Sequence, residues 1–308
     1  MSSPDTVNIT VTASSVLFVT NRSPRKILSF TNPATLNGNV APTTNLSGVQ
    51  TMLNDPVFAT VNSAGALNVT NISAVTIYNN PATANGNVAP SANILGPQTQ
   101  LTNTFGIAFD EERNLLYVAN SGTGTNIVAF ANATIANGNV APNRTITSAG
   151  NLNSPRGIFL DDNDNLYVAN AGAKNVLVFA NASTLNGSVT PSRTISSASF
   201  TGALNDVFVD ANNNLFVVNP PAQVLVFNNA STKNGNIMPD VILTVSGAGS
   251  IRCITVDSNG VGFITDAAAN AIYSYNQIAT RNGTVAPDRI ISGGATQLTS
   301  PHGLFLQE

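Results

Sequence analysis

One pattern, Asn-Gly-x-x-x-Pro, divides the chain into equal parts and constrains its fold more than any other feature. Its copies begin 48 to 52 residues apart, at Asn37, Asn85, Asn137, Asn186, Asn234 and Asn282. A regular period of about 50 residues indicates one structural unit built repeatedly, because such a unit buries its apolar surface only against its neighbours. Six near-equal units without a linker predict one domain over residues 1–308, although this length would permit two domains.

The fourth unit shows most clearly what each repeat contains. Short apolar runs at 157–160, 166–169 and 176–179 predict three strands, and the Asp- and Asn-rich segment 161–165 predicts the turn between the first two. A fourth strand is predicted at 193–195. No segment keeps a period of about 3.6 residues for long, so the pattern does not indicate a helical repeat.

The repeated motif lies between the third and fourth strands of its unit. In unit four we predict that Asn181 caps a single helical turn at 182–185, and that Asn186 and Gly187 end this turn in left-handed geometry. Pro191 follows and can begin the outer strand, since an edge strand tolerates a residue without an N–H group. The motif is therefore predicted to be a local connector.

Four short strands per unit, of which the first two are the most apolar, are typical of a propeller blade. The second strand of every unit ends at a polar residue, namely Asn21, Asn71, Asn120, Asn170, Asn219 and Asp266. We therefore predict an all-β fold, a six-bladed β-propeller with four antiparallel strands per blade. The repeats are expected at about 8–50, 57–100, 106–150, 157–200, 206–248 and 253–297, with a closing strand at 303–307.

Two segments compete for the innermost strand of the first blade. Residues 8–12 lie at the correct spacing before Asn21, and residues 303–306 fit the same template. Because the strands nearest the channel are the most apolar, we expect the C-terminal segment to complete blade one. Pairing of N- and C-terminal segments then closes the ring and removes its open edges, and the segment 8–12 is displaced to an edge.

The segment NLYVANAGAKNVLVF at 165–179 resembles the NHL repeat, as do its relatives at 114–130 and 214–227. The likeness covers all six units and is strongest in units three to five, and the chain departs from the family in its long connector with the Asn-Gly motif. The resemblance implies a six-bladed propeller. Such propellers bind proteins, RNA or small ligands, and distant six-bladed relatives are lactonases or lyases.

The composition narrows the classes of function. Charged residues make up 9% of the chain and the net charge is −3, so bulk charge gives no support for nucleic-acid binding. No apolar run approaches the roughly 18 residues of a membrane span. The single cysteine excludes an internal disulfide. A surface rich in Asn, Ser and Thr favours an extracellular, periplasmic or cell-surface protein, although no signal peptide is visible. We expect a monomer without a cofactor.

The positions just before the innermost strands differ between the units and are expected to border one mouth of the channel. They are Val57, Phe105, Arg156, Asn205, Arg252 and His302. Two arginines and the only histidine, with Asn205 between them, predict a site for a small anionic ligand, because Arg binds carboxylate or sulfate in a bidentate manner. The alternative is that each arginine pairs with a carboxylate such as Asp206, or faces solvent.

Other polar residues have structural explanations. The six Asn and Asp residues that end the second strands encircle the same mouth, and we expect each to cap the turn that follows it, since a binding site seldom needs six copies of one group. Asp161 is predicted to form an Asx turn. We expect Arg22, Arg25 and Lys26 to be solvated, and Cys253 to be a small core residue.

Three functional hypotheses follow. The leading one is a non-enzymatic module that binds an anionic ligand, a glycan or a protein at this mouth. The second comes from the resemblance to lactonases, which implies a divalent-metal lactonase or lyase, but gluconolactonase-like propellers hold the cation with Glu, Asn and Asp at these positions. Only Asn205 matches, whereas Arg156, Arg252 and His302 would repel a cation. The third is a structural element of a larger surface protein. We assign no catalytic residue and no metal ligand.

Overall fold

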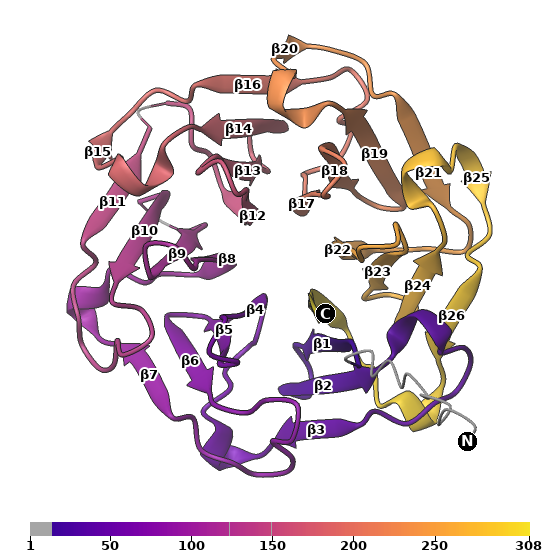
Figure 1. The fold of residues 1–308 in the computed structure, drawn as a ribbon, viewed down its shortest axis with the longest axis horizontal. Coiled ribbons are helices and arrows are strands. Elements are labelled where there is room, and N and C mark those ends of the chain that lie inside the picture. The colour runs from indigo at the N-terminus through magenta and orange to yellow at the C-terminus, as the bar shows by residue number, and fades with distance from the viewer. Residues whose placement is uncertain (1–13, 123, 149) are drawn as a thin grey trace, which may run out of the picture.

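The structure, a computed structural model, describes residues 14–122, 124–148 and 150–308. Six sheets stand around a central channel, and the chain passes from one sheet to the next around the ring (Figure 1). Within each sheet, four antiparallel strands follow one another from the channel outward. The predicted all-β, six-bladed propeller is thus confirmed.

Each blade begins with its innermost strand at the channel and ends with its outermost strand at the perimeter. In this order, blade one contains β27 (Pro301–Gln307), β1 (Val16–Asn21), β2 (Lys26–Thr31) and β3 (Thr44–Ser47). Blade two contains β4 (Ala59–Val61), β5 (Leu67–Asn71), β6 (Ala74–Tyr78) and β7 (Ala92–Leu95). Blade three contains β8 (Thr104–Asp110), β9 (Leu115–Asn120), β10 (Asn126–Ala131) and β11 (Arg144–Thr147). Blade four contains β12 (Pro155–Leu160), β13 (Leu166–Asn170), β14 (Asn175–Phe179) and β16 (Arg193–Ser196). Blade five contains β17 (Asp206–Val209), β18 (Asn214–Asn219), β19 (Gln223–Asn228) and β21 (Val241–Val245). Blade six contains β22 (Ile251–Val256), β23 (Gly262–Asp266), β24 (Ala271–Tyr275) and β26 (Arg289–Ser292).

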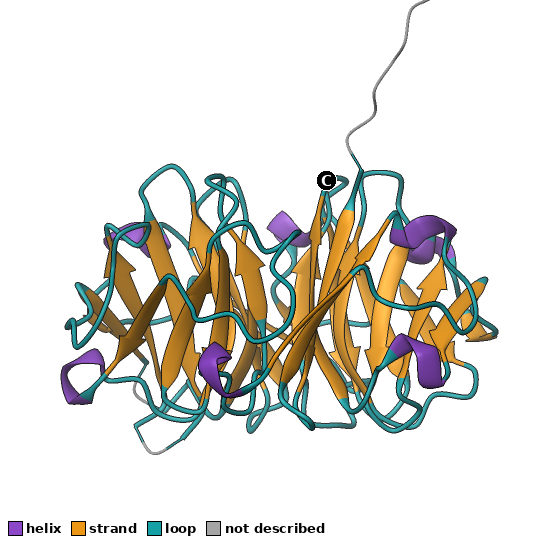
Figure 2. Ribbon diagram, turned by 90° about the horizontal axis from the view of Figure 1, so that it is seen from below, coloured by secondary structure: helices purple, strands orange, loops and turns teal. Residues whose placement is uncertain are grey.

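The described helices are single 3₁₀ turns in the loops at the ends of the strands (Figure 2). They are η1 (Pro33–Thr35), η2 (Val49–Thr51), η3 (Pro97–Thr99), η4 (Ala182–Thr184), η5 (Ala230–Thr232), η6 (Ile278–Thr280) and η7 (Gly294–Thr296). None of these helices is long and apolar enough to cross a membrane.

The two ends of the described chain pair in blade one. Strand β27 runs antiparallel to β1, with Val16 opposite Gln307 and Asn21 opposite Pro301. The prediction that the C-terminal segment supplies the innermost strand is therefore correct. The competing segment 8–12 lies outside the described residues.

Successive side chains of a strand point to opposite faces of the sheet, and this alternation explains how the blades pack. In β13, Leu166 and Val168 pack against blade three, whereas Tyr167 and Ala169 pack against blade five. This is the two-residue period of a strand whose two faces are both buried. Each blade is therefore a layer between two others, and the apolar cores lie between blades.

The Asn-Gly motif connects neighbouring blades, which its sequence did not predict. In blade four, the Asn186 side-chain oxygen accepts the Thr145 N–H of blade three at 2.9 Å. Gly187 opens the two-residue strand β15 (Gly187–Ser188), which pairs in parallel with the outer strand β11. The Gly187 backbone has a φ of +79°, a conformation that glycine adopts without a steric cost.

The same connection is repeated at all six boundaries between blades. The side-chain oxygens of Asn37, Asn85, Asn137, Asn234 and Asn282 likewise accept the N–H of Ile290, Asn45, Asn93, Thr194 and Ile242. The following glycines pair with the preceding blade's outer strand, either as single bridges or in the short strands β20 (Gly235–Asn236) and β25 (Gly283–Val285). Figure 1 shows β15, β20 and β25 at the perimeter of the ring. We call these contacts the Asn-Gly clamps.

The local prediction for this connector was partly wrong. A helical turn is present at Ala182–Thr184, but Asn181 makes no side-chain capping bond and is itself left-handed, with a φ of 53°. The turn ends at Leu185 in extended geometry, not at Gly187. Asn186 and Gly187 do not terminate the turn because their polar groups serve the neighbouring blade instead.

Replacing Asn186 by Ala should lower the free energy of unfolding by about 0.5–1.5 kcal/mol, since it removes one hydrogen bond between blades three and four. Urea unfolding followed by circular dichroism measures this difference. A suitable control is Asn163→Ala, because Asn163 is exposed and its side chain makes no hydrogen bond among the described residues. Equal stability of both variants would mean that the clamp contributes nothing.

Candidate functional site

Irregularities in the inner strands lie at one mouth of the channel. The register shifts between Thr104 and Ile107 in β8, between Pro155 and Ile158 in β12, and between Ile251 and Ile254 in β22. A similar shift occurs where β27 faces β1. Bulges of this kind re-aim side chains. The shifted segments contain Phe105, Arg156, Arg252 and His302, four of the six positions at which the units differ.

Side chains from several blades meet at this mouth. Arg156 donates a hydrogen bond from Nη1 to the side-chain oxygen of Asn205, and its guanidinium carbon lies 5.8 Å from the centre of the Phe105 ring. The His302 ring packs edge-on against Phe58, with ring centres 5.4 Å apart, and against Phe105 at 6.2 Å. The fold thus brings predicted residues from blades one, three, four and five together with Phe58.

Hydrogen bonds between blades position the backbone of the mouth. Threonines on second strands donate to carbonyl oxygens of the next inner segment: Thr20 to Val57 at 2.7 Å, Thr70 to Phe105 at 2.7 Å and Thr265 to His302 at 2.6 Å. Asn205 donates from Nδ2 to the Ile251 carbonyl at 2.9 Å. Hydrogen bonds between neighbouring blades therefore hold the backbone of the rim in place.

Positive charge accumulates around a neutral histidine. Burial, followed by the charges of Arg22, Arg252 and Arg156, lowers the pKa of His302 well below its usual value. Burial and the neighbouring guanidinium groups also lower the pKa of Arg156 and of Arg252. Both arginines stay charged at neutral pH because the ordinary pKa of arginine is so high. The mouth therefore brings the charges of three arginines, of which Arg22 is paired with Asp55, near an imidazole whose protonation is disfavoured by burial.

Several buried nitrogens of this group lack a partner among the described residues. They are Nε of Arg156, Nε of Arg252 and Nδ1 of His302, which can be either donor or acceptor in the neutral ring. Asp206 does not pair with either arginine, because its carboxylate accepts the Ile254 N–H at 3.1 Å. The alternative of an Arg156–Asp206 ion pair is not seen in this part of the chain.

Arg22 belongs to the mouth, although we expected it to be solvated. Its guanidinium makes a two-pronged contact with Asp55, with Nε donating to Oδ1 at 2.6 Å, and its charge acts on His302. Lys26 is also buried, and only Arg25 is exposed as expected. The position of Arg22, directly after Asn21 at the end of a second strand, was the signal that could have placed it at the mouth.

The six residues that end the second strands hold loops in place. Each accepts a backbone N–H from the loop that leads into the innermost strand of its own blade: Asn21 from Thr299, Asn71 from Asn54, Asn120 from Thr102, Asn170 from Asn153, Asn219 from Gly202 and Asp266 from Gly249. We expected each residue to cap the turn that follows it. Asp266 does so, because it also accepts the Ala268 N–H. All six residues are at most 1% exposed, so their contacts leave little to offer a ligand.

The residues at the mouth do not fit a divalent cation. The side-chain oxygen of Asn205 already accepts from Arg156, and its amide nitrogen donates to the Ile251 carbonyl. Arg156, Arg252 and Arg22 place positive charge where a cation would lie. Within the described ranges, no group of three or more His, Cys, Asp or Glu side chains is arranged to hold a metal ion.

Two further predictions concern residues away from the mouth. Asp161 forms the predicted Asx turn, since its Oδ1 accepts the N–H groups of Asn163 at 3.0 Å and Asn165 at 2.8 Å. Cys253 is 2% exposed and lies in the core, as predicted. Neither residue contributes to the mouth.

Comparison with known proteins agrees with the architecture. A family model described as "SMP-30/Gluconolactonase/LRE-like region" matches residues 4–220. No curated protein matches the sequence. A chain in the crystal structure of a nidogen/laminin complex is similar over 96% of this chain and 98% of that chain, with a TM-score of 0.65 and 14% identity. A protein of unknown function from Bacteroides caccae is similar over 96% of this chain and 99% of that chain, with a TM-score of 0.65 and 10% identity. At these identities the structural likeness shows the fold alone.

The neutral state of His302 can be measured directly, since this residue is the only histidine in the chain. Its imidazole NMR signals should remain those of a neutral ring at pH values where an ordinary histidine is already protonated, because burial lowers the pKa of His302 well below its usual value. Because the unfolded chain would take up a proton below about pH 6.5 and the native protein excludes it, this residue lowers stability as the pH falls. The His302→Asn variant should therefore gain stability relative to the wild type as the pH is lowered. A titration midpoint near the usual value would contradict the burial of His302 and its proximity to three arginines.

Proposed function

Because the SMP-30/gluconolactonase/LRE-like model matches residues 4–220, the chain belongs to this family, and from this premise we propose that it binds a small organic oxyanion at the channel mouth. The ligand carries a carboxylate or sulfate group that contacts Arg156 and Arg252. In this proposal the mouth is a binding site and performs no reaction.

The observation that carries the proposal is the set of buried cationic donors without partners. A guanidinium group that loses water is costly unless an acceptor replaces that water. Nε of Arg156 and Nε of Arg252 have no acceptor among the described residues, and the carboxylate of Asp55 is engaged by Arg22. Neither Arg156 nor Arg252 forms an ion pair among the described residues, so an oxyanion would supply the missing counter-charge, and the planar fork of each arginine suits two parallel hydrogen bonds to it.

The other residues of the mouth suit the organic part of such a ligand. Phe58 and Phe105 provide apolar surface, and Phe105 also supports the Arg156 guanidinium, which lies over its ring. The neutral His302 ring can donate or accept a hydrogen bond to a hydroxyl group. A hydroxylated or otherwise polar carboxylate therefore matches the site better than a purely apolar one.

A second candidate function follows from the family description, which includes gluconolactonase. A divalent metal ion would need anionic ligands at the mouth, but arginines occupy these positions. Lactone hydrolysis at this mouth would therefore have to use other groups than the ligands of a divalent-metal site. We therefore prefer binding to catalysis. Lactones and the sugar acids formed from them are still the first ligands to examine.

We also propose that the protein works outside the cytoplasm as a recognition module. The support is compositional: only 9% of residues are charged, and Asn, Ser and Thr take the usual place of Lys and Glu. A glycan or a protein that presents an acidic group would meet the same rim of arginines. A purely structural role in a larger surface protein predicts no ligand at the mouth.

Replacing Arg156 or Arg252 by Ala should weaken binding of sodium gluconate or inorganic sulfate roughly 10- to 150-fold, since each variant removes a charge-assisted contact of about 1.5–3 kcal/mol. Isothermal titration calorimetry measures the change. Arg144→Ala is the control, because Arg144 lies on the outer strand β11 and should leave binding unchanged. Equal affinity of the wild type and the double variant for both anions would overturn the proposal.

Catalysis is tested separately on the purified wild-type protein. Elemental analysis should find no stoichiometric divalent metal, and γ- or δ-lactones should not be hydrolysed above the uncatalysed rate with or without chelator. A bound metal together with chelator-sensitive turnover would replace the binding proposal by the lactonase candidate.

A further inference from the structure

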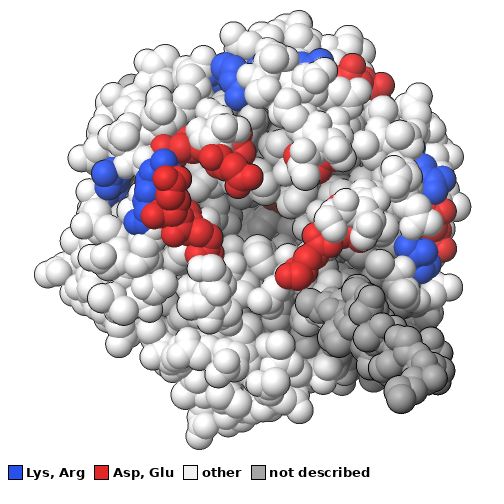
Figure 3. All heavy atoms as spheres, in the orientation of Figure 1, with Lys and Arg blue, Asp and Glu red and all other residues white. Residues whose placement is uncertain are grey.

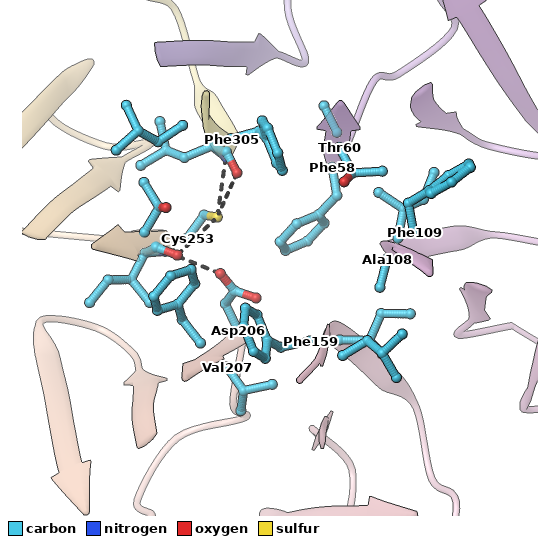
Figure 4. Close-up of a pocket in the computed structure, with 18 of the residues that line it drawn as sticks. Phe58, Thr60, Ala108, Phe109, Phe159, Asp206, Val207, Cys253 and Phe305 are labelled. Carbon is cyan, nitrogen blue, oxygen red and sulfur yellow. Dashed lines mark hydrogen bonds between the residues drawn. The ribbon is translucent and has the colours of Figure 1, made fainter. Parts of the chain in front are cut away.

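A cavity lies inside the channel, toward the face opposite the arginine mouth. Its volume is about 320 Å³, within the range of small-molecule sites. All six innermost strands line it, and five aromatic rings contribute: Phe58, Phe109, Phe159, Phe208 and Phe305. Figure 4 shows four of these rings, those of Phe58, Phe109, Phe159 and Phe305, arranged around the cavity. Arg156, Asn205, Arg252 and His302 are not among the lining residues.

One buried carboxyl group points into this aromatic cavity. The Asp206 side chain is 4% exposed and lies beside Cys253 among the phenylalanines (Figure 4). Its Oδ2 accepts the Ile254 N–H at 3.1 Å. All 12 Lys and Arg residues lie in the described part of the chain, and none forms an ion pair with Asp206.

The absence of a counter-charge changes the state of this carboxyl group. Burial raises the pKa of Asp206 to about 7. Burial also raises the pKa of the Cys253 thiol well above its usual value, so the thiol stays neutral and the Leu304 N–H donates to its sulfur at 3.2 Å. Asp206 is therefore the one interior group of the cavity that can carry charge, and a bound cation would favour its ionised form.

The entrance to the cavity is acidic. Glu308 lines it, and the adjoining hollow is bordered by Glu111, Glu112, Asp161 and Asp162. Figure 3 shows these acidic residues around the central depression on this face. Arg113, the basic residue of the hollow, is already paired with Asp110 and Glu112. A cleft lined by one sign of charge concentrates ligands of the opposite charge.

We propose that this cavity binds a small organic ammonium ion, with the cationic head against Asp206 and the faces of the surrounding phenylalanines. An ammonium with methyl groups suits these walls, because aromatic faces attract cations and the methyl groups need no hydrogen-bond acceptors. The acidic rim guides the cation inward. The site differs from the arginine mouth in ligand charge and in the end of the channel that it uses. Phe58 lies between the two, since it packs against His302 and also lines the cavity. The proposal does not depend on the function proposed for the mouth.

Binding of choline and of its neutral carbon isostere, 3,3-dimethylbutan-1-ol, tests the proposal on the intact wild-type protein. The two molecules have nearly the same shape and differ in charge. Choline should bind about tenfold or more tightly than the alcohol, as measured by calorimetry or ligand-observed NMR. Equal affinities, or no choline binding at millimolar concentration, would overturn the proposal.

Variants locate the site. Asp206→Asn should weaken choline binding about tenfold or more, and the amide oxygen can still accept the Ile254 N–H. Phe208→Leu, which removes a ring 4.9 Å from that of Phe159, should weaken choline binding without altering charge. Arg156→Ala should leave choline binding unchanged. Unchanged affinity in folded Asp206→Asn, or loss of binding in Arg156→Ala, contradicts the assignment; if Asp206→Asn does not fold, Phe208→Leu and the isostere comparison decide.

Discussion

A ring of six blades can form a common channel only if each blade is held to the next at the perimeter and at the centre. At the perimeter the Asn-Gly clamps perform this task, because each Asn side chain and Gly backbone extend the outer strand of the preceding blade. They also cover strand edges that would otherwise present unpaired N–H and C=O groups to other chains. At the centre, β27 pairs with β1 and joins the two ends of the chain. All other features of the protein rest on this closed ring.

The closed ring encloses a channel whose two ends carry different side chains. One end collects Arg22, Arg156 and Arg252 around a neutral His302, and the other collects acidic residues around Asp206 and an aromatic cavity. The repeats supply the same backbone at every blade, so the differences come from single side chains at equivalent positions. A propeller can in this way present opposite charges at the two ends of its channel without any change in architecture.

The errors of local prediction have a common physical origin. Asn186 and Gly187 are the residues expected at the end of a helical turn, yet Asn186 accepts the Thr145 N–H and Gly187 pairs with Ile146, about 40 residues earlier. Arg22 looked like a solvated charge in a loop, but the ring places it near Arg252 and His302. The polar residues at the ends of the second strands hold the loops of the inner strands, and not mainly the turns that follow them. In each case the decisive partner lies far away in sequence.

The sequence by itself determined the number of blades, the four strands in each, and the use of the C-terminal segment to close the ring. These properties follow from repeat period, from apolar alternation and from turn residues, all of which act over a few neighbouring positions. It also indicated that Arg156, Asn205, Arg252 and His302 border one mouth, since strand direction places equivalent positions on one face. Only the tertiary structure decided that Arg22 and Phe58 join them, and that Asp206 is buried in an aromatic cavity without a counter-charge. The reason is that side-chain convergence across a ring depends on the curvature and register of all six blades together, and no short stretch of sequence contains that information.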